Sequence, residues 1–156
     1  MGMGKPRTYR AAEENEGASE PLGIRPLRLL LVEDNAADVL LFQGAVQELP
    51  LKVDIQVAQD AEKALVLLSD RSFEFELVIL DLNLPKFSGY QVLERYTRKS
   101  VPVVVFTSSR SEVDARCALA LGARDVVQKP SELRPYRDAV RKMIEKWAPQ
   151  SSAGSA

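Results

Sequence analysis

The stretch that decides the fold is Leu77-Val78-Ile79-Leu80-Asp81-Leu82-Asn83-Leu84-Pro85. Its first four residues are all large and aliphatic, which is typical of a short buried strand. A strand that is apolar on both faces belongs to a parallel sheet with helices covering both sides. The sequence turns polar at Asp81, so this aspartate is predicted to stand at the carboxyl end of the strand.

Strand and helix patterns alternate on both sides of this stretch. Further strands are predicted at Leu27–Val32, Val53–Ala58, Pro102–Phe106 and Asp125–Gln128. Five strands that alternate with five helices imply a doubly wound α/β fold, in which right-handed crossovers join parallel strands. Ligands in this architecture bind beyond the carboxyl ends of the strands. The ends of the predicted strands are therefore the places to look for function.

The helices are predicted from apolar spacing and from capping residues. The first runs over Ala36–Leu49, Asp60 caps the second, a capping box at Ser88-Gly89-Tyr90-Gln91 opens the third, and Ser111 caps the fourth, which Gly122 ends. The last helix carries apolar residues from Leu133 to Trp147. Its start stays open between a cap at Ser131 and a first residue at Pro135.

Composition narrows the class of protein. The chain has 156 residues, 46% of them hydrophobic, and a net charge of −1. This predicts one folded domain over residues 26–147, with a flexible extension over 1–25 and a disordered tail over 148–156. The balanced charge gives no reason to expect a nucleic acid partner, and no apolar run is long enough to predict a membrane span.

Histidine and cysteine usage removes several kinds of chemistry. The chain has no histidine and a single cysteine, Cys117. Catalysis by a Ser-His-Asp or Cys-His set, zinc-histidine sites and internal disulfides are therefore excluded, and we expect a reducing, cytoplasmic location. Cys117 lies on the apolar side of its predicted helix, so we expect a core thiol there. Tyr136 and Trp147 are likewise expected to pack in the core.

Chemically active side chains follow four of the five predicted strands. Glu33 and Asp34 follow the first, Asp81 the third, Thr107 the fourth and Lys129 the fifth. Each of these residues alone is a common cap or turn residue. Together they place three carboxylates, a hydroxyl and an ammonium group at one edge of the sheet.

This combination of groups favours phosphoryl chemistry. Carboxylates that share a site repel one another, and a hard divalent ion such as Mg²⁺ is well suited to hold them together. The central carboxylate, Asp81, can act as a nucleophile toward phosphorus. Lys129 would supply a second positive charge, and Thr107 would donate a hydrogen bond to a phosphoryl oxygen.

The ordered set of motifs resembles the receiver domain of two-component response regulators. The stretches that carry the resemblance are Leu29-Leu30-Leu31-Val32-Glu33-Asp34-Asn35, Val78-Ile79-Leu80-Asp81-Leu82-Asn83-Leu84-Pro85, Val103-Val104-Val105-Phe106-Thr107-Ser108-Ser109 and Gly122-Ala123-Arg124-Asp125 with Lys129-Pro130. The resemblance spans about residues 26–147 and implies a flavodoxin-like five-stranded parallel sheet of order 2-1-3-4-5. The segments Asp81-Leu82-Asn83-Leu84-Pro85-Lys86 and Glu145-Lys146-Trp147 are similar to those of small receivers paired with phytochrome-type kinases.

The resemblance implies a role for each residue of the metal site. Asp81 would accept a phosphoryl group from a phosphohistidine of a sensor histidine kinase. Asp34 would bind Mg²⁺ directly and Glu33 through water, with Asp81 and the backbone carbonyl of Asn83 as further ligands. The protein would then be a switch that controls an unknown downstream partner, rather than a true enzyme.

The resemblance also implies how the phosphate is detected. Thr107 would move toward the phosphoryl group, and Lys129 would pair with Asp81 and the phosphate. The Lys129–Pro130 bond is often cis in this family. Receivers often carry an aromatic residue three positions before this lysine, but here the position holds Val126. The output signal is therefore expected to rely on the fourth helix and the loop before it.

Other functions compete with this interpretation. An aspartyl-phosphate phosphatase of the haloacid dehalogenase type would need a second acid at position 83, where this chain has Asn83. An inactive adaptor with a receiver fold would be favoured if the acceptor or the lysine were missing. No output domain follows residue 147, so we expect a stand-alone receiver. A homodimer paired through the fourth and fifth helices is a further alternative.

Overall fold

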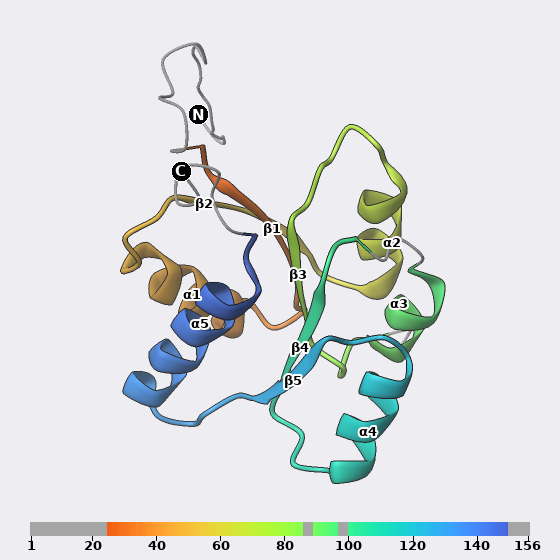
Figure 1. The fold of residues 1–156 in the computed structure, drawn as a ribbon. Helices are drawn as coiled ribbons and strands as arrows, with labels where there is room; N and C mark the ends of the chain where they lie inside the picture. Colours follow the sequence, from red (N-terminus) through yellow and green to blue (C-terminus); the bar gives the residue numbers. More distant parts are fainter. Residues whose placement is uncertain (1–24, 86–88, 97–99, 150–156) are drawn as a thin grey trace. The chain divides into compact units, whose positions relative to one another are not determined.

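The computed structural model of the protein describes residues 25–85, 89–96 and 100–149. Residues 26–149 form one compact unit, a five-stranded parallel sheet with helices on both faces (Figure 1). The strand order is β2-β1-β3-β4-β5, which confirms the predicted flavodoxin-like topology. The predicted extension and tail lie outside the described residues, except for Arg25, Ala148 and Pro149.

The strands and helices alternate strictly along the chain. The strands are β1 (Leu27–Val32), β2 (Val53–Ala58), β3 (Leu77–Leu80), β4 (Val103–Thr107) and β5 (Asp125–Gln128). The helices are α1 (Ala36–Gln47), α2 (Ala61–Ser69), α3 (Gly89–Arg95), α4 (Glu112–Ala120) and α5 (Leu133–Trp147). Among the described residues, none of these helices combines the length and apolar character that a membrane span requires.

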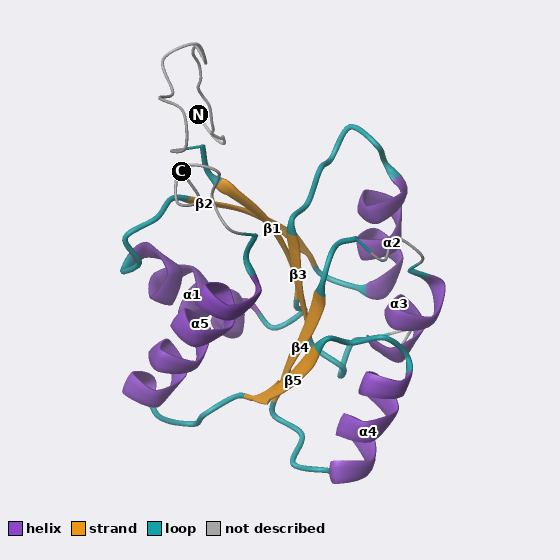
Figure 2. Ribbon diagram, viewed as in Figure 1, coloured by secondary structure: helices purple, strands orange, loops and turns teal. Residues whose placement is uncertain are grey.

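Two apolar cores lie on opposite faces of the sheet, as the helix layers in Figure 2 show. In β3, Val78 and Leu80 pack beneath α2, α3 and α4, whereas Leu77 and Ile79 pack beneath α1 and α5. The other central strands alternate in the same way, because successive side chains of a strand point to opposite faces. This double burial explains why the central strands are continuous apolar runs.

Helix ends follow the predicted capping chemistry in most cases. The side chains of Asp60 and Ser111 accept hydrogen bonds from the backbone N–H groups of Lys63 and Asp114, as expected of N-caps. Gly122 follows the end of α4 with φ of 113°, a conformation that favours glycine. Its N–H donates to Leu119 O, which satisfies one of the free carbonyls at the helix end.

Three predictions about the helices are wrong. The first helix ends at Gln47 and not at Leu49. The last helix begins at Leu133 with Glu132 as its N-cap, so neither Ser131 nor Pro135 marks the start. Pro135 instead occupies the first turn, where a missing N–H breaks no helical bond. Cys117 is exposed rather than buried, because Ala118 is the residue of α4 that faces the sheet. The predicted cap at Ser88 lies outside the described residues.

Gly89 begins α3 directly against the strand end that carries Asp81. Its N–H donates to Leu82 O at 2.7 Å. A Cβ atom at this position would lie 2.5 Å from the backbone oxygen of Asp81 and 2.7 Å from Leu82 Cα. Glycine is therefore required for the close approach of α3 to the site.

We expect Gly89→Ala to lower the free energy of unfolding by about 2 kcal/mol, the scale of overpacking, because backbone atoms must move apart. Gly44, inside α1, is a matched control, since a Cβ there meets nothing within 4 Å. Gly44→Ala should raise stability by about 0.5–1 kcal/mol through helix propensity. Urea unfolding monitored by circular dichroism measures both. Equal effects of the two substitutions would contradict the packing argument.

Candidate functional site

The register of the sheet brings the predicted site residues together at its carboxyl edge. Val32 of β1 is paired with Leu80 of β3, so the residues that follow them, Glu33 and Asp81, emerge side by side. The Asp81 N–H donates to Val32 O at 3.0 Å. At the other side of the site, the Lys129 N–H donates to Thr107 O at 2.7 Å.

Three carboxylates form an acidic cluster at this edge. One oxygen each from Glu33, Asp34 and Asp81 lie within 4.8 Å of one another. Glu33 and Asp81 are buried, at 3% and 8% exposure, whereas Asp34 is exposed. Hard carboxylate oxygens with one side open to water match the preference of Mg²⁺ or Mn²⁺, which retain water ligands. The donor set therefore fits a divalent metal ion.

The ammonium group of Lys129 reaches over the sheet edge into this cluster. Its Nζ atom lies 2.6 Å from Glu33 Oε1, 3.0 Å from Asp38 Oδ2 and 3.4 Å from Asp81 Oδ2. The Lys129 side chain is only 8% exposed, and Nζ lies 5.9 Å from the centre of the Phe106 ring. The ring beneath it provides an apolar support and a weak cation–π attraction.

Charge and burial act in opposite directions on these groups. Burial raises the pKa of Glu33, and the hydrogen bond and positive charge of Lys129 offset part of that rise. Burial alone would lower the pKa of Lys129, but its bond to Glu33 and the charge of Asp81 outweigh this and raise it. Lys129 therefore stays charged at any physiological pH.

Thr107 is buried at 1% exposure and belongs to a hydrogen-bonded network in the loop between β4 and α4. Its Oγ1 accepts from Ser109 N–H at 3.2 Å, and Ser109 Oγ donates to Asp114 Oδ2 at 2.7 Å. The hydroxyl of Tyr90, from α3, donates to Asp114 Oδ1 at 2.8 Å. Burial and the bond to Asp114 raise the pKa of Tyr90 to about 12. The network connects the threonine to α3 and α4.

Three further predictions concern the surroundings of the site. Asn83 is exposed, and its backbone N–H donates to Asp81 Oδ1 at 3.2 Å. Val126 is half-buried and packs against the core beneath α2, α3 and α4. The expected cis bond before Pro130 is absent, because the described residues contain no cis peptide. The trans form is the intrinsically preferred isomer even before proline.

Sequence reasoning missed Asp38, Tyr90 and Asp114. Asp38 lies in the first turn of α1, and a carboxylate there is usually explained as a favourable interaction with the helix N-terminus. Tyr90 and Asp114 are distant in sequence and meet only through the packing of α3 against α4. No local pattern distinguishes any of the three.

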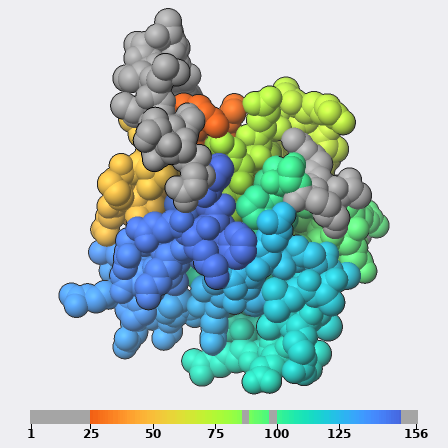
Figure 3. Space-filling view, viewed as in Figure 1, coloured from red at the N-terminus to blue at the C-terminus, as the bar shows by residue number. Residues whose placement is uncertain are grey.

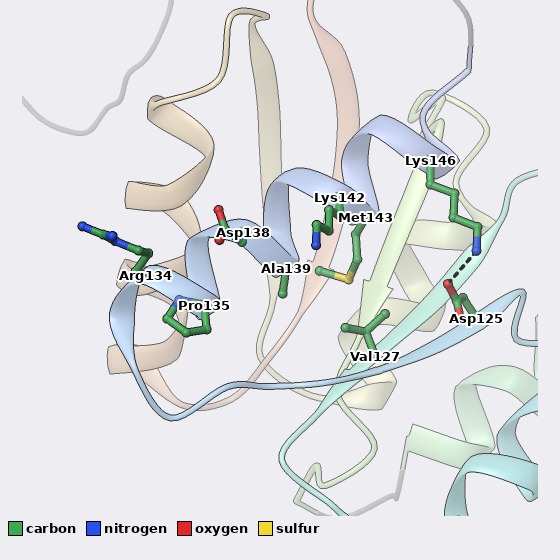
Figure 4. A pocket seen from close by; sticks show the side chains of 9 residues that line it. All are labelled: Asp125, Val127, Arg134, Pro135, Asp138, Ala139, Lys142, Met143 and Lys146. Carbon is green, nitrogen blue, oxygen red and sulfur yellow. Dashed lines mark hydrogen bonds and ion pairs between the residues drawn. The ribbon is translucent and has the colours of Figure 1, made fainter.

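The remaining described surface contains a groove between α5 and β5, away from the acidic cluster (Figure 4). Its floor is apolar, with Val127 and Met143, and Lys146 is paired with Asp125 at 3.4 Å. Asp125 also accepts a hydrogen bond from Trp147 Nε1 at 3.2 Å.

Tyr136 is buried among core residues, as predicted. The last part of the chain, drawn in blue, forms much of the face seen in Figure 3.

A doubly wound sheet with these groups at its carboxyl edge defines the class of two-component receivers. Residues 29–141 match the family model of the response regulator receiver domain, and the chain belongs to this family. The predicted resemblance is thereby confirmed.

Two similar proteins are matched over most of their length. The probable methanogenesis regulatory protein FilR2 of Methanothrix harundinacea is 34% identical over 131 residues, which are 78% of this chain and 84% of FilR2. The response regulator Rcp1 of Synechocystis is 30% identical over 132 residues, 78% of this chain and 89% of Rcp1. The chain is thus similar to relatives that consist largely of a receiver.

Solved structures agree with the fold. The phosphorylated cyanobacterial phytochrome response regulator RcpA superimposes with a TM-score of 0.73 at 29% identity, covering 79% of this chain and 94% of RcpA. The Mn²⁺-bound form of Rcp1 gives a TM-score of 0.72 at 27% identity, covering 81% and 98%. The acidic cluster described above is consistent with the divalent ion in that Rcp1 structure.

Lys129→Met should lower the free energy of unfolding by about 3 kcal/mol, because buried Glu33 and Asp81 lose their cation. Without that cation, burial raises the pKa of Glu33 further above its ordinary value of 4.5. A folded-state pKa above the unfolded value means that stability is lost as pH rises through the interval between them. The loss should therefore be larger at about pH 8 than at about pH 4.

Urea unfolding at the two pH values measures this effect, and Lys142→Met is the matched control because Lys142 is exposed on α5. The control should change stability by less than about 0.5 kcal/mol at either pH. A loss for Lys129→Met that does not grow with pH would show that the ion pairs are not its source.

Proposed function

We propose that the protein is a phosphorylation-controlled switch that accepts a phosphoryl group on Asp81 and controls a partner through the resulting conformational change. The observation that carries the proposal is the position of Asp81, which lies between Glu33, Asp34 and the ammonium group of Lys129. Asp81 Oδ1 accepts the backbone N–H of Asn83 at 3.2 Å and Oδ2 contacts Lys129 Nζ at 3.4 Å, so the carboxylate is held in place beyond the end of β3.

The phosphodonor in this proposal is the phosphohistidine of a sensor histidine kinase. A carboxylate oxygen of Asp81 attacks phosphorus, an O–P bond forms, and the P–N bond to the donor imidazole breaks with its electron pair on nitrogen. Lys129 neutralises charge on the phosphoryl oxygens, and Thr107 donates a hydrogen bond to one of them. Such transfer depends mainly on positioning and charge neutralisation, which is what these fixed groups provide.

Glu33, Asp34, Asp81 and the backbone carbonyl of Asn83 would hold Mg²⁺ in this proposal. When bound, the ion supplies positive charge that brings the carboxylates and the phosphoryl oxygens together. Asp34 is suited to direct ligation because it is exposed, and Glu33 to a water-mediated role because its carboxylate already pairs with Lys129.

The switch would be transmitted through the loop between β4 and α4. Movement of Thr107 toward the phosphate must break or carry along its bond to Ser109, and Ser109 in turn holds Asp114 of α4. Position 126 holds a valine, so the signal cannot be transmitted by the rotation of an aromatic ring at this position. A phosphatase function is not favoured, since Asn83 lacks the acid that steady hydrolysis would require.

Similarity to RcpA and Rcp1 supports a phytochrome-type kinase as the donor, because the RcpA structure is described as a phytochrome response regulator. The downstream partner would be another protein that contacts α4 or its preceding loop. Each 1.4 kcal/mol of difference in contact between the two states shifts their equilibrium about tenfold.

Incubation with acetyl phosphate and Mg²⁺ should add one phosphoryl group to the wild-type protein and none to Asp81→Asn, as measured by intact mass. EDTA during labelling should prevent the addition. Asp54→Asn is the matched control, since Asp54 is an exposed acid on β2, and it should be labelled like the wild type. Labelling of Asp81→Asn would disprove the acceptor, and a folded wild type that takes no phosphate would favour the adaptor function.

Mg²⁺ should stabilise the wild type by about 2.7 kcal/mol at a concentration 100-fold above its dissociation constant. Asp34→Asn should lose most of this gain because it removes one of the three carboxylates of the cluster. In EDTA the same variant should be at least as stable as the wild type, since charge repulsion is lower. Urea unfolding with and without Mg²⁺ tests this, and an equal gain in both proteins would exclude Asp34 as a ligand.

A further inference from the structure

Asp38 is a fourth carboxylate at the site and has no role in the function proposed above. It is the third residue of α1, and its N–H donates to the side chain of the N-cap, Asn35, at 3.0 Å. In a capping box the Asp38 carboxylate would accept the N–H of Asn35 in return. The backbone N–H of Asn35 instead donates to Glu33 Oε2 at 3.2 Å. The Asp38 carboxylate accepts a hydrogen bond from Lys129 Nζ at 3.0 Å.

Lys129 uses all of its donors in this arrangement. An ammonium group has three N–H donors. Its Nζ atom contacts three carboxylates, and the contact to Asp38 at 3.0 Å is shorter than the contact to Asp81 at 3.4 Å. When Asp81 is phosphorylated, its negative charge passes to the phosphoryl group, and the Lys129 donor that faces Asp81 can serve one phosphoryl oxygen. A second phosphoryl oxygen can gain Lys129 only if the contact to Glu33 or to Asp38 is given up.

Exposure decides which contact is given up. The side chain of Glu33 is 4% exposed, whereas that of Asp38 is 32% exposed. A buried carboxylate that loses its cation is left without compensation, but water can replace the lost partner of Asp38. Release of Asp38 is thus the least costly way to free a donor of Lys129.

We propose that Asp38 is a positioning residue that holds Lys129 in the unphosphorylated protein and is exchanged for a phosphoryl oxygen when Asp81 is modified. The inference rests on the proposed function, because it concerns the phosphorylated state of Asp81. Asp38 opposes phosphorylation in this arrangement because it competes with the phosphoryl oxygens for the ammonium group of Lys129, so a neutral side chain at position 38 favours the modified state.

The test uses beryllium fluoride, which mimics a phosphoryl group on a carboxylate, at saturating Mg²⁺. Its apparent dissociation constant is measured by nuclear magnetic resonance titration of the full-length protein. Asp38→Asn should bind it about fivefold more tightly than the wild type, the ratio that corresponds to one partly exposed ion pair. Asp38→Glu keeps the carboxylate and should restore the wild-type value.

Glu132→Gln is the matched control for charge. Glu132 is exposed and lines the same depression as Lys129, and its side chain caps no helix. It should bind within about twofold of the wild type if contact with Lys129, rather than net charge, is what matters. Equal tightening by Glu132→Gln and Asp38→Asn, or no tightening by Asp38→Asn, would overturn the inference. Wild-type protein that binds no beryllium fluoride and takes no phosphate would instead reject the proposed function itself.

Discussion

The contact of Lys129 with the acidic cluster is the interaction on which the rest of the site depends. Each buried ion loses several kcal/mol of hydration, and the loss is recovered only when opposite charges and hydrogen bonds surround it. The lysine follows β5, yet its ammonium group reaches Asp81 after β3 and Glu33 after β1 by passing above the ring of Phe106 in β4. The strand order therefore has a chemical consequence, because it brings the cation and the acids to one edge.

The stability of the apolar sheet offsets the energetic cost of burying these charges. β1, β3 and β4 bury large aliphatic side chains on both faces, and each buried side chain contributes about 1.5–3 kcal/mol. The same residues fix the register, since a shift of one position would exchange the two faces of every strand. Glu33 and Asp81 are held side by side by this register and not by any attraction between them. The packed core thus keeps the two carboxylates close together despite their mutual repulsion, and this repulsion favours the binding of a cation.

The elements that sequence predicted correctly are those with a strong local pattern. The strands β1 and β3 coincide with the predicted ranges because each is a buried apolar run ended by a polar residue. The ranges of β2 and β5 were also correct, although both strands are only partly buried, whereas β4 runs over Val103–Thr107 instead of the predicted Pro102–Phe106. Cys117 was misplaced, since α4 is amphipathic only weakly and a rotation by one residue exchanges Cys117 for Ala118 at the core. Asp38 was missed for a different reason. Its partner Lys129 lies 91 residues away, and only the packed sheet shows that the two meet.

A phosphoryl group on Asp81 would act on both helix layers at once. On one side, Lys129 would release Asp38 of α1, in the layer that α1 forms with α5, and bind a phosphoryl oxygen instead. On the other side, Thr107 is joined through Ser109 to α4 and α3 in the opposite layer. A small valine at position 126 leaves no ring to couple the two sides, so the sheet edge itself must do so. If both contacts respond to the same phosphoryl oxygen atoms, as proposed, the change in α1 and the change in α4 would belong to one equilibrium rather than two.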